Sequence, residues 1–122
     1  MYLRKGAMEI VKHEHRIKKA NSPHCAVYEY PTSNPKIDIA TATISGREPI
    51  IGVAENIVCT ELVHVTKGCG SITIDGREYL IYTGDSILIE PGEKFVWSGD
   101  LELVIVCTPR WNSDQHVIHN EI

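Results

Sequence analysis

The chain has 122 residues, of which 43% are hydrophobic, and a formal net charge of −4. This length suits one domain with a single packed core. Because no apolar run reaches the ~20 residues of a membrane span, and the N-terminal stretch lacks the apolar centre of a secretory signal, we expect a cytoplasmic protein that does not enter a membrane. The four cysteines include no Cys-x-x-Cys pair, which favours reduced thiols over zinc ligands or disulfides.

Residues 1–24 form a basic N-terminal arm. It holds six Lys or Arg residues against two Glu and so carries +4, which leaves −8 on the other 98 residues. Its alternating polar and apolar residues suit an edge strand that pairs with a second subunit, so we expect a homodimer, with a solvated lead-in strand as the alternative for the arm. Aromatic residues are absent from the arm after Tyr2, so stacking on nucleic acid is not expected. His13 and His15 have the spacing of two metal ligands on one face of a strand, but the surrounding positive charge disfavours a bound cation.

Residues 25–110 show short β-rich runs separated by turns. The expected strands cover residues 26–30, 36–45, 59–68, 70–82, 85–91, 94–98 and 101–109. Asp75-Gly76 splits the fourth run into a hairpin, because this dipeptide favours two-residue turns. Further turns are expected at Gly46-Arg47 and Gly99-Asp100. Many short strands without a helical period predict an all-β antiparallel sandwich or barrel.

Residues 111–122 form a C-terminal tail that we expect to pack on the barrel or on a partner. Asn112 or Ser113 could cap one helical turn there, with Gln115 or His116 near its third position. Trp111 is the residue expected to anchor this tail.

Two stretches of the chain have the residue spacing of the two sequence signatures of one protein family. Glu61 and Gly68 fit the first, and the second is matched in sequence by Gly84, Asp85, Ile89, Pro91 and Gly92. The chain therefore resembles a small single-domain cupin of unassigned function. This resemblance implies a cupin-type jelly-roll β-barrel, also called a double-stranded β-helix.

The metal ligands of that family are mostly missing. The three histidine positions of the signatures fall on Ala54, Asn56 and Phe95, and only Glu61 remains of the ligand set. Transition metals in such sites prefer imidazole nitrogen together with a carboxylate. We therefore expect no metal cofactor, with an unusually liganded metal as the alternative.

Strand alternation predicts what faces the barrel interior. If Phe95 points inward, Trp97 does too, and Glu61 points inward with Val63 and Val65 while His64 points outward. An aromatic wall beside a carboxylate and an amide suits a small molecule, although aromatic side chains also fill small barrels. A buried Glu61 needs a hydrogen-bonding partner. The candidate ligand-binding residues are Arg47, Asn56, Glu61, Phe95, Trp97 and His116.

Two functions follow from this pocket. The first is a metal-free, small-molecule-binding protein whose ligand is a carbohydrate or a small organic acid. The alternative is an enzyme of the isomerase, epimerase or lyase type, with Glu61 and His116 as the catalytic acid–base pair. A purely structural hydrogen bond of Glu61 is the competing interpretation of that residue.

Overall fold

The structure is a computed structural model that describes residues 2–3 and 8–120. Within these ranges the regular structure is β-strand, apart from two short 3-10 helices, η1 (His13–His15) and η2 (Ser113–Gln115). The all-β prediction is confirmed. No helix in the described ranges has the length and apolar character to cross a membrane. The strands are β1 (Tyr2–Leu3), β2 (Glu9–Ile10), β3 (Ile17–Ser22), β4 (Cys25–Glu29), β5 (Asp38–Glu48), β6 (Val53–Asn56), β7 (Thr60–Ile74), β8 (Arg77–Tyr82), β9 (Ser86–Ile89), β10 (Lys94–Thr108) and β11 (His116–His119).

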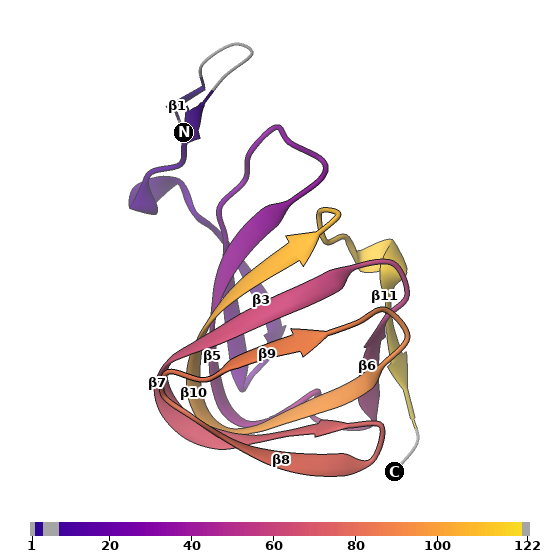
Figure 1. Cartoon of the computed structure of the whole chain (residues 1–122). Helices are drawn as coiled ribbons and strands as arrows, with labels where there is room; N and C mark the ends of the chain where they lie inside the picture. The colour runs from indigo at the N-terminus through magenta and orange to yellow at the C-terminus, as the bar shows by residue number, and fades with distance from the viewer. Residues whose placement is uncertain (1, 4–7, 121–122) are drawn as a thin grey trace.

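Nine of these strands form one antiparallel sheet that curls on itself (Figure 1). The order along its main path is β11-β6-β10-β5-β4-β3, and β7 branches from it to pair with β10, β8 and β9. β1 and β2 form a separate two-stranded sheet, which projects from the barrel. The long strands β7 and β10, of 15 residues each, run side by side and connect the two parts of the curled sheet.

Three glycines in register form the bend of the long strands. Gly99 of β10 lies opposite Gly46 of β5 and Gly70 of β7. A Cβ atom at Gly99 would lie 2.6 Å from the carbonyl oxygen of Cys69, and one at Gly70 would lie 2.1 Å from that of Ser98. Any larger residue would therefore push the strands apart at the point where the sheet turns.

The turn predicted at Asp75-Gly76 is present, whereas the two turns predicted at the bend are not. Asp75-Gly76 joins β7 to β8, with φ values of 49° and 84°, as expected for a tight hairpin. The turns expected at Gly46-Arg47 and Gly99-Asp100 are instead inside β5 and β10. There glycine permits a bent strand rather than a reversal of the chain.

The basic arm and the C-terminal tail each add one strand to the barrel sheet. β3, from the basic arm, pairs with β4, and β11, from the tail, pairs with β6. Asn112 caps η2 as expected, because its Oδ1 accepts a hydrogen bond from the backbone N–H of Asp114 at 3.0 Å. His13 and His15 lie in η1 with exposed side chains.

The core follows the predicted alternation along β7. Val63 and Val65 are fully buried, whereas His64 is exposed. Ile72, Ile89, Leu101 and Leu103, all fully buried, belong to the same cluster. These branched residues fill one part of the barrel.

Candidate functional site

A cavity of about 510 Å³ occupies the other part of the barrel. Strands β3, β4, β5, β6, β7, β10 and β11 and the segment around η2 contribute to its wall. Lys19 and Asn112, which are exposed, also belong to its lining. Phe95 and Trp97, each 4% exposed, pack in the core and also line the cavity, so the aromatic residues do not fill the barrel completely.

Glu61 is the buried carboxyl group of the cavity wall, at 7% exposure. Its Oε1 accepts a hydrogen bond from Asn56 Nδ2 at 3.1 Å and lies 3.9 Å from Cys107 Sγ. Burial raises the pKa of Glu61 to about 7, because the charged form loses its water, and the hydrogen bond from Asn56 opposes this only in part. At neutral pH this carboxyl group is therefore able both to donate and to accept a proton.

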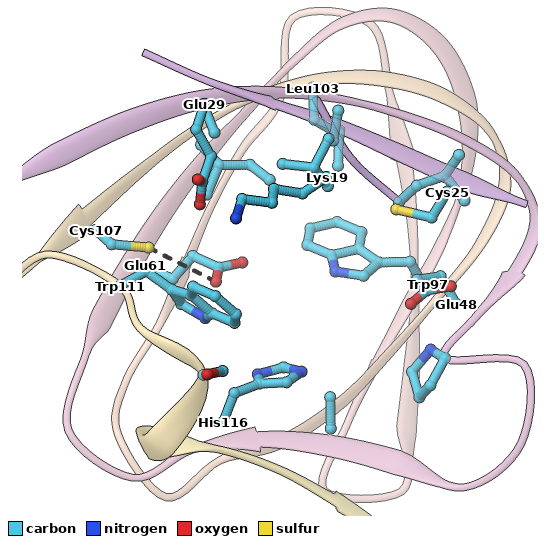
Figure 2. A pocket seen from close by; sticks show the side chains of 18 of the residues that line it. Lys19, Cys25, Glu29, Glu48, Glu61, Trp97, Leu103, Cys107, Trp111 and His116 are labelled. Atoms are coloured by element: carbon cyan, nitrogen blue, oxygen red, sulfur yellow. Dashed lines mark hydrogen bonds between the residues drawn. The ribbon is translucent and has the colours of Figure 1, made fainter. Parts of the chain in front are cut away.

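His116 approaches the same cavity from the start of β11. Its Nδ1 lies 3.0 Å from Asn56 Oδ1, and its ring packs against Trp111 at a centroid distance of 5.4 Å and Phe95 at 6.5 Å. Burial lowers the pKa of His116, because the imidazolium is poorly solvated there. Figure 2 shows His116 and Glu61 on the wall of one cavity, with Trp97 across from Glu61.

Asn56 lies behind the cavity wall rather than on it. It is 1% exposed, and the cavity lining contains two of its three side-chain partners, Glu61 and His116, but not Asn56 itself. Gln115 Nε2 donates a further hydrogen bond to Asn56 Oδ1 at 3.1 Å. One buried amide thus connects the two titratable groups that were predicted to act together.

Arg47 is placed differently from the expectation that it binds the ligand. Its side chain is outside the cavity lining, and its guanidinium donates to the carbonyl oxygens of Pro49 at 2.6 Å and Gly52 at 2.9 Å. Arg47 therefore holds the loop between β5 and β6. This role depends on the path of that loop, which the sequence did not reveal.

The residues at the family's metal positions do not fit a divalent metal. Ala54 and Phe95 offer no ligand atom, and the amide of Asn56 is engaged by Glu61, Gln115 and His116. Across residues 2–3 and 8–120 no group of three or more His, Cys, Asp or Glu side chains is arranged to hold a metal ion.

Sequence reasoning missed several charged residues of the cavity. Asp38 accepts a hydrogen bond from the backbone N–H of Trp111 at 2.9 Å, and burial raises the pKa of this carboxyl group. Glu48 accepts from Ser22 Oγ at 2.6 Å. Glu29 completes the acidic lining, and Lys19 points into the cavity from β3 (Figure 2). No local motif marks these four residues, because they come from three strands that meet only in the folded sheet.

Trp111 and Gln115 were noticed in the sequence but were not among the candidate ligand-binding residues. Trp111 was expected to anchor the tail, and it also lines the cavity beside His116. Gln115 directly precedes His116, and this adjacency was the available signal for its role.

Comparison with known proteins gives similarity in structure only. No family model matches the chain. No curated protein matches it either. Among solved structures, Pac13, described as a unique nucleoside dehydratase and found in Streptomyces, is 15% identical with a TM-score of 0.84, covering 95% of this chain and 94% of its own.

Two further structures agree in fold. An RmlC-like cupin from Shewanella frigidimarina is 13% identical with a TM-score of 0.70, covering 88% of this chain and 96% of its own. KdgF from Halomonas sp. is 10% identical with a TM-score of 0.67, covering 84% of this chain and 96% of its own. Identities this low establish the fold alone. The chain therefore has the cupin fold, a single-domain jelly-roll β-barrel, as its sequence signatures implied.

Proposed function

We propose that this protein is an acid–base enzyme that binds a small, uncharged ring compound in the barrel cavity and transfers protons on it through Glu61 and His116. The observation that carries the proposal is the pairing of these two residues on one wall. Both hydrogen-bond to the side chain of Asn56, at 3.1 and 3.0 Å, and both line the cavity. The pKa of Glu61 is raised and that of His116 is lowered, and shifted pKa values of this kind are common in active sites.

The class of ligand follows from the lining. A volume of about 510 Å³ is in the range of small-molecule sites. Trp97, Trp111 and Phe95 offer aromatic faces on which a ring can stack. Even with Glu61 protonated, the acidic side chains Glu29, Asp38 and Glu48 outnumber the ammonium of Lys19 in the lining, so the cavity disfavours anions. A sugar or nucleoside thus fits better than the small organic acid considered from the sequence.

The reaction class follows from the protonation states. Neutral His116 can accept a proton from a carbon that a neighbouring carbonyl acidifies, and protonated Glu61 can donate a proton to a hydroxyl on the adjacent carbon. The C–H and C–O bonds break, a C=C bond forms, and the hydroxyl leaves as water. The proposed activity is therefore a lyase of the dehydratase type. Pac13, which shares the fold, is described as a nucleoside dehydratase, and variants of it have been solved with uridine.

The experiment begins with binding. Tryptophan fluorescence and thermal shift are measured against nucleosides and neutral sugars, together with their oxidised aldehyde or ketone forms. Ligands that bind are then incubated with the protein in D₂O, and NMR follows deuterium incorporation and loss of water. We expect exchange with the wild type and at least about 10²-fold less with Glu61→Gln or His116→Gln.

Two outcomes would contradict the proposal. Binding without any exchange or elimination would make the protein a binding protein, as in the first sequence-based hypothesis. Preferential binding of phosphorylated or carboxylated ligands would reject the proposed ligand class.

A further inference from the structure

We propose that Gln115 is a positioning residue, which through Asn56 fixes the Nδ1–H tautomer of His116 and so makes His116 Nε2 the base of the site. A chain of buried and partly buried hydrogen bonds, called the relay below, runs from the backbone of residues 58–59 through Gln115 and Asn56 to His116. Each bond fixes the direction of the next.

The first step orients the amide of Gln115. Its Oε1 lies 3.2 Å from the backbone nitrogen of Val58 and 3.0 Å from that of Cys59. A backbone N–H can only donate, so the oxygen of the Gln115 side chain must face these two groups. Gln115 is 4% exposed, and its NH₂ group consequently points at Asn56.

The second step orients the amide of Asn56. Because Gln115 Nε2 donates at 3.1 Å, Asn56 must present its oxygen there, since two NH₂ groups cannot bond to each other. The NH₂ group of Asn56 then faces Glu61 Oε1 at 3.1 Å. In this orientation Asn56 donates a hydrogen bond that the ionised carboxylate of Glu61 can accept.

The third step sets the tautomer. Asn56 Oδ1 also lies 3.0 Å from His116 Nδ1. An amide oxygen can only accept, so Nδ1 must carry the hydrogen, and in the neutral ring Nε2 carries the lone pair. The packing of the ring against Trp111 and Phe95 keeps it in this place. Burial, which lowers the pKa of His116, keeps the ring neutral at pH 7.

The relay assigns the two proton-transfer roles. His116 offers a bare nitrogen to the cavity and is the base, while Glu61, with its proton near neutrality, is the acid. This assignment rests on the proposed function. The tautomer and its dependence on Gln115 do not, because they can be measured without any ligand.

The test uses NMR of the full-length protein labelled with ¹⁵N-histidine. Long-range ¹H–¹⁵N spectra distinguish the protonated ring nitrogen from the bare one. The protein has six histidines, and the His116→Gln variant identifies the signal of interest. At pH 8.5 we expect wild-type His116 to carry its hydrogen on Nδ1. A signal from the Nε2–H tautomer would overturn the proposal without any substitution in Gln115.

The decisive variant is Gln115→Glu. A carboxylate at this position still accepts from the two backbone N–H groups, which favour its ionised form, but it no longer donates to Asn56. The Asn56 amide then turns its NH₂ group toward residue 115 and toward His116 Nδ1, and its oxygen toward residue 61. Because Glu61 is ionised at pH 8.5 and would oppose this turn, the comparison is made in the Glu61→Gln background, where the side-chain NH₂ group can donate to that oxygen. There we expect the Nε2–H tautomer at pH 8.5. If His116 retains the Nδ1–H tautomer in this folded double variant, Gln115 does not set it.

The matched control is Asn112→Asp. It adds the same charge on the same 3-10 turn, while a carboxylate oxygen can still cap the N–H of Asp114. We expect the Nδ1–H tautomer to persist in this variant. A tautomer change here as well would show that charge alone, rather than the relay, is responsible, and would reject the proposal.

Kinetics separate this proposal from the proposed function. With a substrate in hand, Gln115→Glu should lower kcat about 10²-fold while KM changes little, because Gln115 is not part of the cavity lining. If the tautomer behaves as expected but no substrate is ever turned over, the relay stands and the proposed function falls. If turnover is found but wild-type His116 carries its hydrogen on Nε2, the relay falls alone.

Discussion

Asn56 Nδ2 lies 3.1 Å from Glu61 Oε1, and this contact holds a carboxyl group that is almost fully buried in the cavity wall. A neutral amide stabilises the carboxylate less than a cation would, so it only partly offsets the loss of hydration. The pKa of Glu61 accordingly lies at about 7 instead of the ordinary 4.5. Stability and protonation are therefore linked at this residue.

The first prediction concerns the pH dependence of stability. Because the folded-state pKa of Glu61 is raised, the folded protein binds more protons than the unfolded chain between pH 4.5 and about 7. The wild type should lose about 3 kcal/mol of unfolding free energy from this residue as the pH rises through that window. Glu61→Gln should lack this loss, which urea unfolding at pH 4 to 8 measures. A free-energy difference between the two proteins that is independent of pH would contradict the pKa shift.

The second prediction concerns the coupling of Asn56 to Glu61. Asn56→Leu removes the hydrogen-bonding partner of buried Glu61 and Gln115 and of partly buried His116, and we expect it to cost about 3 kcal/mol or more. The double variant with Glu61→Leu should cost less than the sum of the two single changes, because one of the stranded groups is then absent. Denaturant unfolding of the four proteins measures this coupling, and strict additivity would show that the contact is energetically unimportant.

The third prediction concerns ligand charge. A neutral ligand found by screening should bind at least about tenfold more tightly than its phosphate ester at low salt, and added salt should narrow the gap. Glu48→Gln keeps an acceptor for Ser22 but removes a negative charge from the cavity. It should therefore also reduce the difference in affinity between the neutral ligand and its phosphate ester. Glu102→Gln makes the same charge change on the surface, where Glu102 pairs with Lys67, and should have no such effect. An equal effect of both variants would indicate general electrostatics rather than the cavity.

Features that depend on neighbours along the chain could be predicted from the sequence. The hairpin at Asp75-Gly76 and the inward side of β7 follow from dipeptide preference and alternation, and both are present. The prediction at Gly99 was wrong because a glycine that bends a strand and one that ends it look alike locally. Gln115 contacts Asn56, which lies 59 residues away, so its role exists only once β11 has paired with β6. The barrel was thus predictable, whereas the relay behind the cavity was not.

The fourth prediction concerns thiol reactivity. Cys69 is exposed, whereas Cys59 and Cys107 are buried, and burial raises the pKa of both of these thiols. A thiol-specific reagent should therefore modify one cysteine rapidly in the native protein, and Cys69→Ser should abolish that phase. Cys107 lies on the cavity wall and should react only slowly there. Rapid modification of a second cysteine in Cys69→Ser would show that the barrel opens readily.

The fifth prediction concerns the bend that creates the cavity. A side chain at Gly99, whose φ is 129°, would meet the backbone of Cys69 and Gly70 at 2.6 Å, and neither strand can move without disturbing the sheet. Gly92 has a φ of 89°, and a Cβ atom added there would have no neighbour within 4 Å, so Gly92→Ala meets backbone strain alone. We expect Gly99→Ala to lower the free energy of unfolding by about 1–3 kcal/mol more than Gly92→Ala. Urea unfolding of both variants measures the difference. Equal losses would mean that the close approach of β7 and β10 does not constrain the barrel, and the cavity would then owe its shape to its side chains.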